Sequence, residues 1–348
     1  MSFSKYLEEQ IKKHPSMQPQ DIVKLCYQAA YGDDHLVYDK NALRSYLERK
    51  CSRMHSNRLE MFENISDDIC RVNLAAWINS SLPLAWLFDL FLLSSKQIKG
   101  TRADFINNVN KADKVISDSA VSFSYDDWTS YIDEYKKLGI HSVYHSPQYH
   151  KREMPAYNVI SRKYVYLIPV LKEICTRVHV HFPFIIAIDG RCASGKSTMA
   201  EDLKSIIHAD IIKTDHFFLP PSGRSKVRLN EPGGNIDHER FNEEIISAIS
   251  SPYPFSYRAY DCHTDTYSDV NIGDNYFRIV EGSYSCHPSF GKYADLTVFV
   301  DIDNETQLQR IEERNSLKEA EVFKNKWIPL EEDYFKSFKI KEQADIVL

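Results

Sequence analysis

The sequence predicts two domains. The first is mainly helical and covers residues 1–175, and the second is an α/β domain over residues 182–348, with helices on both faces of a parallel sheet. A length of 348 residues exceeds one typical domain and suits two. Hydrophobic residues make up 43% of the chain and charged residues 26%, which is typical of a globular protein. In the second half, apolar β-branched runs alternate with stretches of helical periodicity, which is the pattern of a parallel α/β sheet.

Charge, cysteine usage and hydropathy limit the environment and the partners that we expect. The net charge of −6 argues against a broad nucleic-acid surface. Seven scattered cysteines without a CxxC pair indicate reduced thiols, and therefore a cytoplasmic protein. The most apolar stretch, residues 82–93, is too short to span a bilayer and contains Asp89. We therefore expect no membrane and no nucleic-acid partner, while a homo-oligomer is left open.

Apolar residues at helical spacing predict the helices of the first half. Pro83 suits the first turn of one of them, with Ser81 as its N-cap, and Gly139 is placed as a helix stop. Residues 163–178 resume an apolar pattern that leads into the second half. The other predicted helices lie within residues 21–32, 41–51, 71–98, 104–116 and 125–139.

Two histidine-containing stretches of the first half raise the question of a metal site. The stretch GDDHL, residues 32–36, places two carboxylates beside a histidine, but a turn followed by a helix cap explains it better. Residues 141–161 are rich in His, Tyr and Pro and predict a long loop, with histidines at 141, 145 and 150 that lack metal-ligand spacing. A loop of this length suggests a binding role.

The stretch FIIAIDGRCASGKSTMAEDL, residues 184–203, carries the main chemical signal. Its apolar start predicts a buried parallel strand, and residues 197–207 have helical spacing. The residues between them match G-x-x-x-x-G-K-[ST], a loop whose backbone N–H groups wrap a phosphate chain at the start of a helix. We expect Lys196, in a solvated loop, to reach the β- and γ-phosphates and Ser197 to bind Mg²⁺. The predicted cofactors are ATP and Mg²⁺, and the predicted nucleotide-binding residues are Gly190, Ala193, Ser194, Gly195, Lys196, Ser197 and Thr198.

Further functional residues are predicted along the rest of the second half. A short apolar strand ends at Asp215, where a carboxylate at the carboxyl edge of a sheet can accept a proton from a substrate hydroxyl. Asp237 starts a helix, either as an N-cap or as a substrate ligand. Glu281 ends another strand, where it can hold Mg²⁺ or help to place the acceptor. Strands are also expected within 296–303 and 344–348, and the charged helical stretch between them carries two candidate phosphate-contacting arginines, Arg310 and Arg314.

These segments together resemble the uridine kinase family of P-loop kinases, over residues 182–348 only. GRCASGKST matches the phosphate-binding loop, and TDHFF resembles the segment whose Asp is the catalytic base, here Asp215. NIDH resembles the segment whose Asp binds ribose hydroxyls, here Asp237, and PFSYRAYDCHT resembles the segment near the base pocket, which aligns Tyr260 and Asp261. IVEGSY, VFVDIDNETQLQRIEERN and ADIVL resemble the strand end, the strand with its arginine-bearing lid, and the closing strand. The resemblance implies that Arg310 and Arg314 contact phosphates.

The sequence departs from that family where the pyrimidine would be read. Cys262 stands at an aromatic position, and Asp265 stands where the family has a histidine that contacts the pyrimidine. The lid arginines also differ from the family spacing by one residue. An ionised carboxylate only accepts hydrogen bonds, and the uracil edge presents two carbonyl acceptors. Uridine is therefore a poor candidate, and another hydroxyl-bearing molecule is favoured.

We therefore interpret the second half as a kinase that transfers the γ-phosphoryl group of ATP to a hydroxyl of a small, nucleoside-like or other polyol acceptor. One alternative is a nucleotide-sensing P-loop switch whose helical domain binds a partner. Another is a phosphotransferase acting on a macromolecule held by the helical domain. Asp215 and the lid arginines favour the small-molecule kinase, because a switch needs no acceptor base.

Overall fold

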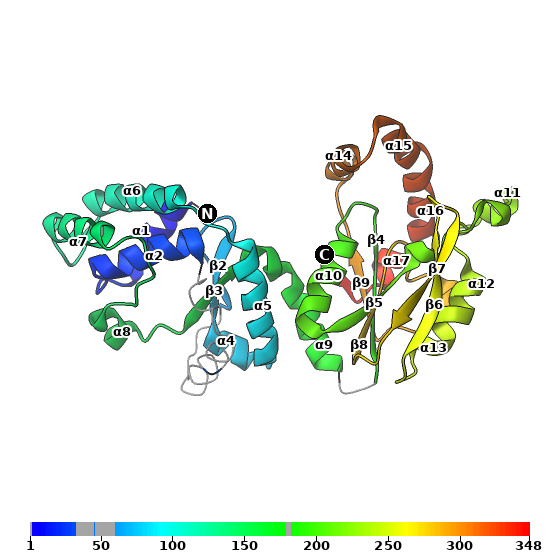
Figure 1. The fold of residues 1–348 in the computed structure, drawn as a ribbon, viewed down its shortest axis with the longest axis horizontal. Helices are drawn as coiled ribbons and strands as arrows, with labels where there is room; N and C mark the ends of the chain where they lie inside the picture. Colours follow the sequence, from blue (N-terminus) through cyan, green and yellow to red (C-terminus); the bar gives the residue numbers. More distant parts are fainter. Residues whose placement is uncertain (1, 33–44, 46–59, 179–181) are drawn as a thin grey trace. The chain divides into compact units, whose positions relative to one another are not determined.

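The computed structural model of the protein describes residues 2–32, 45, 60–178 and 182–348. Its contacts divide the chain into two units, Met1–Val165 and Tyr166–Leu348 (Figure 1). The last helix that the sequence analysis assigned to the first domain, α9 (Ile168–Arg177), thus belongs to the second unit. Within the described ranges, no helix combines the length and the apolar character that crossing a membrane requires.

The first unit combines helices with one small antiparallel sheet. The sheet has the strand order β1-β2-β3, and Ile69 of β2 lies opposite Ser161 of β3. Its strands are β1 (Phe62–Asn64), β2 (Ile69–Asn73) and β3 (Tyr157–Ser161). Its helices are α1 (Phe3–Lys13), α2 (Pro19–Tyr31), α4 (Leu74–Asn79), α5 (Leu84–Gln97), α6 (Arg102–Asp118), α7 (Tyr125–Lys137) and α8 (Pro147–Glu153).

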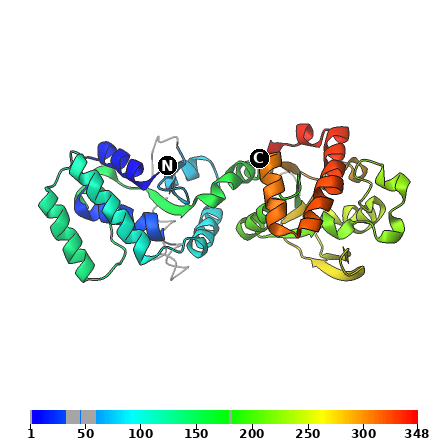
Figure 2. The ribbon, with the colours of Figure 1, turned by 90° about the horizontal axis from the view of Figure 1, so that it is seen from above.

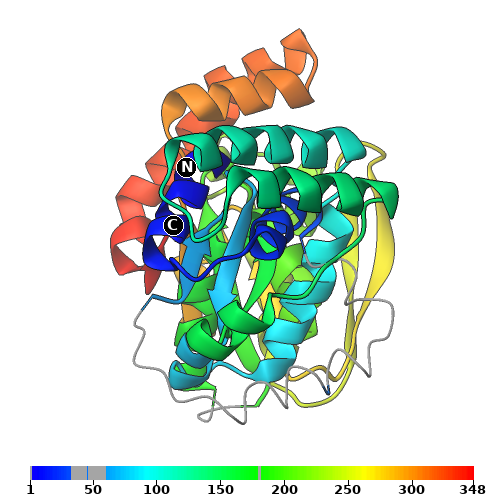
Figure 3. The same cartoon turned by 90° about the vertical axis from the view of Figure 1, so that its left-hand side faces the viewer.

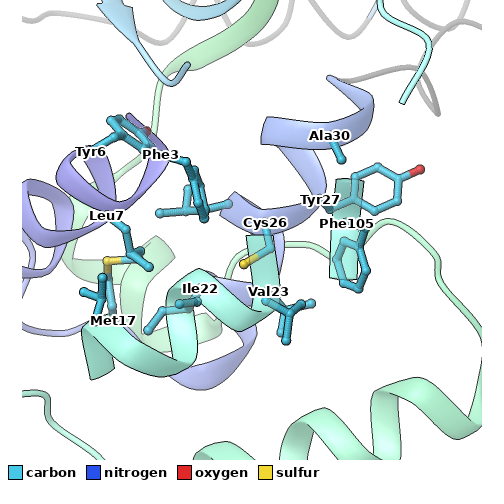
Figure 4. Close-up of a cluster of buried hydrophobic side chains, with 14 of the residues drawn as sticks. Phe3, Tyr6, Leu7, Met17, Ile22, Val23, Cys26, Tyr27, Ala30 and Phe105 are labelled. Carbon is cyan, nitrogen blue, oxygen red and sulfur yellow. The ribbon is translucent and has the colours of Figure 1, made fainter. Parts of the chain in front are cut away.

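Amphipathic helices build the core of this unit. The helices α6 and α7 both pack on α2 (Figure 3). Figure 4 shows how Leu7 of α1, Ile22 of α2 and Phe105 of α6 point into one apolar cluster. The helix α6 starts with a capping box, in which Thr101 accepts from the backbone N–H of Asp104 and the Asp104 carboxylate accepts from that of Thr101. Such caps and the buried apolar faces explain why these helices were predictable.

Several predictions for the first unit are wrong. The long loop expected over 141–161 instead contains α8 and β3. Residues 71–73, assigned to a helix, form the end of β2. Ser81 does not cap α5, because α5 begins after Pro83 without a side-chain cap. The predicted helix over 41–51, except Ser45, and residues 33–36 of GDDHL lie outside the described residues. Gly139 does follow the end of α7, with a φ of 83°.

The second unit is built on a five-stranded sheet with the order β10-β9-β4-β8-β5, and all of its neighbouring strands are parallel. This confirms the predicted fold. A separate antiparallel hairpin, β6–β7, was not predicted. The strands are β4 (Phe184–Gly190), β5 (Ala209–Lys213), β6 (Phe255–Asp261), β7 (Thr266–Ile272), β8 (Phe277–Glu281), β9 (Leu296–Val300) and β10 (Ile346–Val347).

Helices cover both faces of this sheet, as the fully buried strand β4 requires (Figure 1). On one face lie α9 and α10 (Lys196–Ile207). The other face carries the core that includes Ile185, Phe241 of α12 and Tyr334 of α16. The remaining helices are α11 (Lys226–Leu229), α12 (His238–Phe241), α13 (Ser247–Ile249) and, orange to red in Figure 2, α14 (Asn304–Arg314), α15 (Leu317–Val322), α16 (Ile328–Phe338) and α17 (Ile340–Gln343).

The parallel order brings the carboxyl ends of four strands to the same edge of the sheet. Gly190 ends β4 between Glu281 of β8 and Val300 of β9, and Lys213 ends β5 beyond β8. Open α/β sheets bind their ligands at this edge. The residues that follow these strands therefore make up the candidate site.

Candidate active site

The loop between β4 and α10 has the backbone geometry of a phosphate cradle. Gly190 has a φ of 135° and Gly195 a φ of 103°, which glycine adopts readily. A Cβ atom on Gly190 would lie 2.1 Å from the Val300 carbonyl oxygen, so only glycine fits against β9. Ala193, with a φ of 59°, continues the turn, and Ser194 donates its backbone N–H to the Arg191 carbonyl. The cradle then leads directly into the first turn of α10.

Lys196, the first residue of α10, points back into this loop. Its Nζ donates to the carbonyl oxygens of Gly190 at 2.7 Å and Arg191 at 2.8 Å. The side chain is buried, so the expectation of a solvated ammonium is wrong. These bonds hold the cation inside the loop. Thr198, two residues after Lys196 on α10, is exposed.

Ser197 and Glu281 meet across the carboxyl edge of the sheet. The Ser197 hydroxyl donates to Glu281 Oε2 at 3.0 Å. Burial and then the nearby Asp215 charge raise the pKa of Glu281, while the Ser197 hydrogen bond and Lys196 work in the opposite direction. A hydroxyl and a carboxylate side by side are oxygen ligands that suit Mg²⁺, which takes few protein ligands and completes its shell with phosphates and water.

Asp215 lies beside this pair, in a 3-10 helix (Thr214–Phe217) that follows β5. Thr214 anchors the turn by donating to the carbonyl oxygens of Glu281 and Ser283. Gly282 permits the close approach, because a Cβ there would lie 2.2 Å from Thr214 Oγ1 and 3.4 Å from Asp215 Oδ1. Asp215 is exposed on one side, yet desolvation by the surrounding protein raises its pKa, against the lowering effect of Lys196. A carboxyl with a raised pKa is a better proton acceptor than an ordinary aspartate.

The two candidate arginines of α14 differ in where they lie. Arg310 donates from Nη1 to the Ala193 carbonyl of the phosphate-binding loop at 3.1 Å. The Arg314 guanidinium lies over the Phe323 ring, 5.9 Å from its centroid. Both side chains are exposed. In this structure Arg310, rather than Arg314, is the arginine that contacts the loop.

Asp237 is the N-cap of α12, which is one of the two roles that the sequence left open. Its carboxylate accepts from the Arg240 backbone N–H at 3.0 Å, and the Arg240 side chain lies 3.7 Å away. Its own N–H donates to the Phe217 carbonyl, two residues after Asp215. The cap thus places one carboxylate next to the segment that carries Asp215.

The remaining candidates lie on the β6–β7 hairpin. Tyr260 of β6 is buried and donates its hydroxyl to Asp265 at 2.8 Å. Asp265 sits in the turn with a φ of 55°. Asp261 accepts the backbone N–H of His263 within the same turn. Tyr260 and Asp265 thus form a pair, whereas Asp261 serves the turn.

The sequence analysis missed three residues that support the phosphate-binding loop, Asp189, Glu331 and Tyr334. Glu331 of α16 accepts from the Cys192 backbone N–H at 2.9 Å and from the Ser283 hydroxyl at 2.6 Å. Tyr334 donates to the buried Asp189 at 2.8 Å, and burial raises the pKa of Asp189 to about 6. No sequence signal identifies Glu331, because a carboxylate in a charged helical stretch is usually solvated.

We expect Glu331→Ala to loosen the loop. The half-buried Cys192 N–H and the buried Ser283 hydroxyl would lose their acceptor, at a cost of about 1–3 kcal/mol. Amide hydrogen exchange across 190–197 should therefore accelerate about tenfold or more. The matched control is Asp333→Ala, an exposed carboxylate on the same helix. Equal exchange in both variants would show that Glu331 does not hold the loop.

Comparisons with known proteins concern this second half. No known protein-family profile matches the chain. Uridine-cytidine kinase B of Dictyostelium discoideum is 26% identical over 188 residues, which are 49% of this chain and 76% of that protein. A chloroplastic uridine/cytidine kinase of Arabidopsis thaliana is 28% identical over 150 residues, and uridine kinase-like protein 5 of the same plant is 27% identical over 157. The matched part spans only 30% and 33% of these two relatives.

A solved structure described as a possible uridine kinase from Bacillus stearothermophilus aligns with 52% of this chain and 99% of its own, at 18% identity and a TM-score of 0.40. The sheet order and the loop geometry described above define the fold of this unit. The sequence relatives are uridine or cytidine kinases, and the carboxyl edge of the sheet carries a loop with the geometry for binding phosphate, so the two observations agree. The second half of this chain is therefore uridine kinase-like, an α/β domain with a phosphate-binding loop that is related in sequence to uridine and cytidine kinases.

Proposed function

We propose that the second unit transfers the γ-phosphoryl group of ATP to a hydroxyl of a small, nucleoside-like or other polyol acceptor. The observation that carries this proposal is the position of Asp215 next to Lys196 and Glu281, at the mouth of the phosphate-binding loop. A phosphate cradle alone serves switches and motors as well. A carboxylate with a raised pKa beside the cradle supports a kinase, because an acceptor hydroxyl loses its proton during phosphoryl transfer.

The side chains at the loop fit Mg²⁺ and a nucleoside triphosphate. Ser197 and Glu281 would hold the ion, and Lys196 with the backbone N–H groups of the loop would bind the phosphates. When bound, Mg²⁺ neutralises charge on the transferring phosphoryl group. Lys196 adds a fixed positive charge, and Arg310 lies one hydrogen bond from the loop. Asp215 orients the acceptor hydroxyl and takes its proton.

The acceptor would lie between Asp237 and the β6–β7 hairpin. Asp237 supports an acceptor with neighbouring hydroxyls, since a carboxylate accepts two hydrogen bonds from a diol. Tyr260 is 2% exposed, packs its ring near that of Tyr267 and donates its hydroxyl to Asp265, so it would shape the hairpin rather than stack on the acceptor. An acceptor with hydrogen-bond donors is favoured at Asp265, because this exposed carboxylate, which already accepts the Tyr260 hydroxyl, can only accept further hydrogen bonds.

A screen of small hydroxyl compounds for stimulated ADP release from Mg-ATP tests this proposal. We expect one or more polyols or nucleosides to raise ADP release above the rate with water alone. Stimulation by none, together with tight ATP binding, would favour the nucleotide-sensing switch instead.

Uridine and cytidine form the sharpest part of that screen. We expect weak or no phosphorylation of either, with the clearer case for uridine, because Asp265 presents an acceptor toward the two carbonyl acceptors of uracil, whereas cytosine also carries an amino donor. Steady-state assays with both nucleosides measure this. A kcat/KM in the usual enzyme range of about 10⁴–10⁸ M⁻¹s⁻¹ for either one would show that Asp265 does not select against pyrimidines.

A further inference from the structure

A line of ionisable side chains crosses the first unit and has no part in phosphoryl transfer. Asp21 of α2 faces His145, which lies between α7 and α8, and His145 faces Tyr157 at the start of β3. Asp21 Oδ1 is 2.8 Å from His145 Nδ1, and His145 Nε2 is 2.6 Å from the Tyr157 hydroxyl oxygen. A carboxylate, an imidazole and a phenol from three distant segments thus form one chain of hydrogen bonds.

The carboxylate at one end is fixed and ionised. Asp21 is fully buried, and it also accepts from the Gln18 N–H at 2.9 Å, the Ser146 N–H at 2.9 Å and the Ser146 hydroxyl at 2.6 Å. Burial works to raise the pKa of Asp21, but the hydrogen bonds from His145, Ser146 and Gln18 outweigh it and lower the pKa. The ionised Asp21 carboxylate can therefore only accept hydrogen bonds, and the surrounding donors fix its orientation.

An acceptor on one side of His145 determines its tautomer. Burial lowers the pKa of His145 to about 4, so the ring is neutral at neutral pH. Nδ1 then carries the proton that is donated to Asp21, and Nε2 accepts the Tyr157 hydroxyl proton. The Tyr149 ring stacks on the imidazole, with 4.3 Å between the centroids and an angle of 16° between the ring planes, and so restricts its orientation.

The phenol oxygen of Tyr157 also faces a cation. Arg71 of β2 is buried and donates from Nη2 to that oxygen at 3.0 Å, and its guanidinium carbon lies 3.9 Å from the centroid of the Tyr157 ring. Gln28 Oε1 lies 3.2 Å from the same oxygen and is a second, longer acceptor for the Tyr157 proton, and Arg71 Nη1 also lies 3.5 Å from the Glu63 carboxylate. A base that takes the proton and a cation that stabilises the resulting negative charge are the two elements that activate a hydroxyl.

Two further buried groups point to a polar ligand. In the described part of the chain, neither Arg71 Nε nor the Tyr6 hydroxyl has a hydrogen-bond partner. The Arg71 guanidinium carbon lies 5.4 Å from the centroid of the Tyr6 ring. Buried donors normally have an acceptor, so these two offer places for a ligand oxygen.

We propose that the first unit carries a second catalytic centre in which Tyr157 is the reacting group, His145 is its base and Asp21 orients His145. Its substrate class is a small molecule with a weakly acidic hydrogen beside a carbonyl or carboxylate oxygen. The Tyr157 proton moves to His145 Nε2 as the substrate proton moves to the Tyr157 oxygen. Arg71 stabilises the negative charge that is left on the substrate, and the reverse transfers restore the resting state.

Labelling of the full-length protein with an aryl sulfonyl fluoride, quantified by peptide mass spectrometry, tests the activation of Tyr157. Tyr144 and Tyr253, whose side chains are 83% and 73% exposed, are internal references. General-base assistance contributes about 10²–10⁴ in rate, so Tyr157 should label about ten times faster than both references even though it is partly buried. Labelling of Tyr157 at or below the rate of the references would overturn the proposal without any variant.

Variants separate activation from folding. His145→Gln should remove the excess reactivity of Tyr157, whereas His150→Gln, an exposed histidine on α8, should preserve it. Excess reactivity that survives in folded His145→Gln would contradict the role of His145, and Asp21→Asn provides the second variant. For the substrate class, wild type in D₂O should exchange the hydrogen beside the carbonyl of small 2-oxo acids, and Tyr157→Phe should not. No exchange across such a panel would overturn that class.

Discussion

Replacing Asp215 by asparagine is expected to reduce phosphoryl transfer by about 10²–10⁴, the usual contribution of a general base. ATP binding should stay close to wild type, because Lys196 and the loop are untouched. Initial rates with the best acceptor from the screen, and nucleotide titrations of both proteins, measure the two effects. Asp269→Asn, an exposed aspartate on β7, is the matched control. Full transfer activity in Asp215→Asn would remove this residue from the mechanism.

The same carboxyl sets a pH dependence. Its pKa is raised by desolvation, and the base must be ionised to act. As pH falls, Asp215 is therefore protonated earlier than an ordinary aspartate, and the acid limb of the kcat profile should lie above the usual aspartate range. This limb should be absent from the residual activity of Asp215→Asn. Weakened ATP binding alone in that variant would instead indicate a metal ligand.

Lys196→Ala is expected to lower Mg-ATP turnover by about 10²–10³, comparable with the loss of one charge-stabilising donor at a reacting centre. The loss has two sources: the cation at the phosphates disappears, and the carbonyl oxygens of Gly190 and Arg191 lose their shared donor. Because Lys196 is buried, hydrogen exchange across 190–197 should report local loosening as well. Lys204→Ala, on the exposed face of α10, should behave as wild type. ATP binding and turnover that both survive Lys196→Ala would show that this loop does not bind the nucleotide.

The fold of the second unit could be predicted because its signals are local. The strand β4 is apolar on both faces, and the glycines of the following loop have backbone angles that favour glycine. The helix α10 then follows at regular spacing. Strand, loop and helix lie within about two dozen residues, so periodicity and a short motif were sufficient to predict them.

The sheet of the first unit was missed because its pairing is not local. Val72 pairs with Asn158, although 85 residues separate them in the sequence. The strand β1 has only three residues, and β3 starts in a polar stretch that suggested a loop. The hairpin β6–β7 was missed for another reason: most residues of β7 are exposed and polar, so no alternation of apolar residues marks it.

The candidate sites divide in the same way. Lys196, Ser197 and Asp215 follow strands and come with a motif, so the sequence could predict them. Glu331 and the line Asp21–His145–Tyr157 exist only through tertiary contacts between distant elements. The sequence around these residues did not predict their contacts, because a single carboxylate or histidine is common in any solvated segment.

Direct detection of the transferred phosphoryl group tests the central claim, namely that the second unit phosphorylates a hydroxyl acceptor. Wild type and Asp215→Asn would each be incubated with Mg²⁺, γ-labelled ATP and the acceptors that stimulate ADP release, and the label followed by mass spectrometry. We predict that wild type transfers the label to an acceptor hydroxyl and that Asp215→Asn transfers it about 10²–10⁴ times more slowly. The account would be contradicted if the label appeared only as inorganic phosphate. It would also be contradicted if the label stayed in intact ATP with every acceptor.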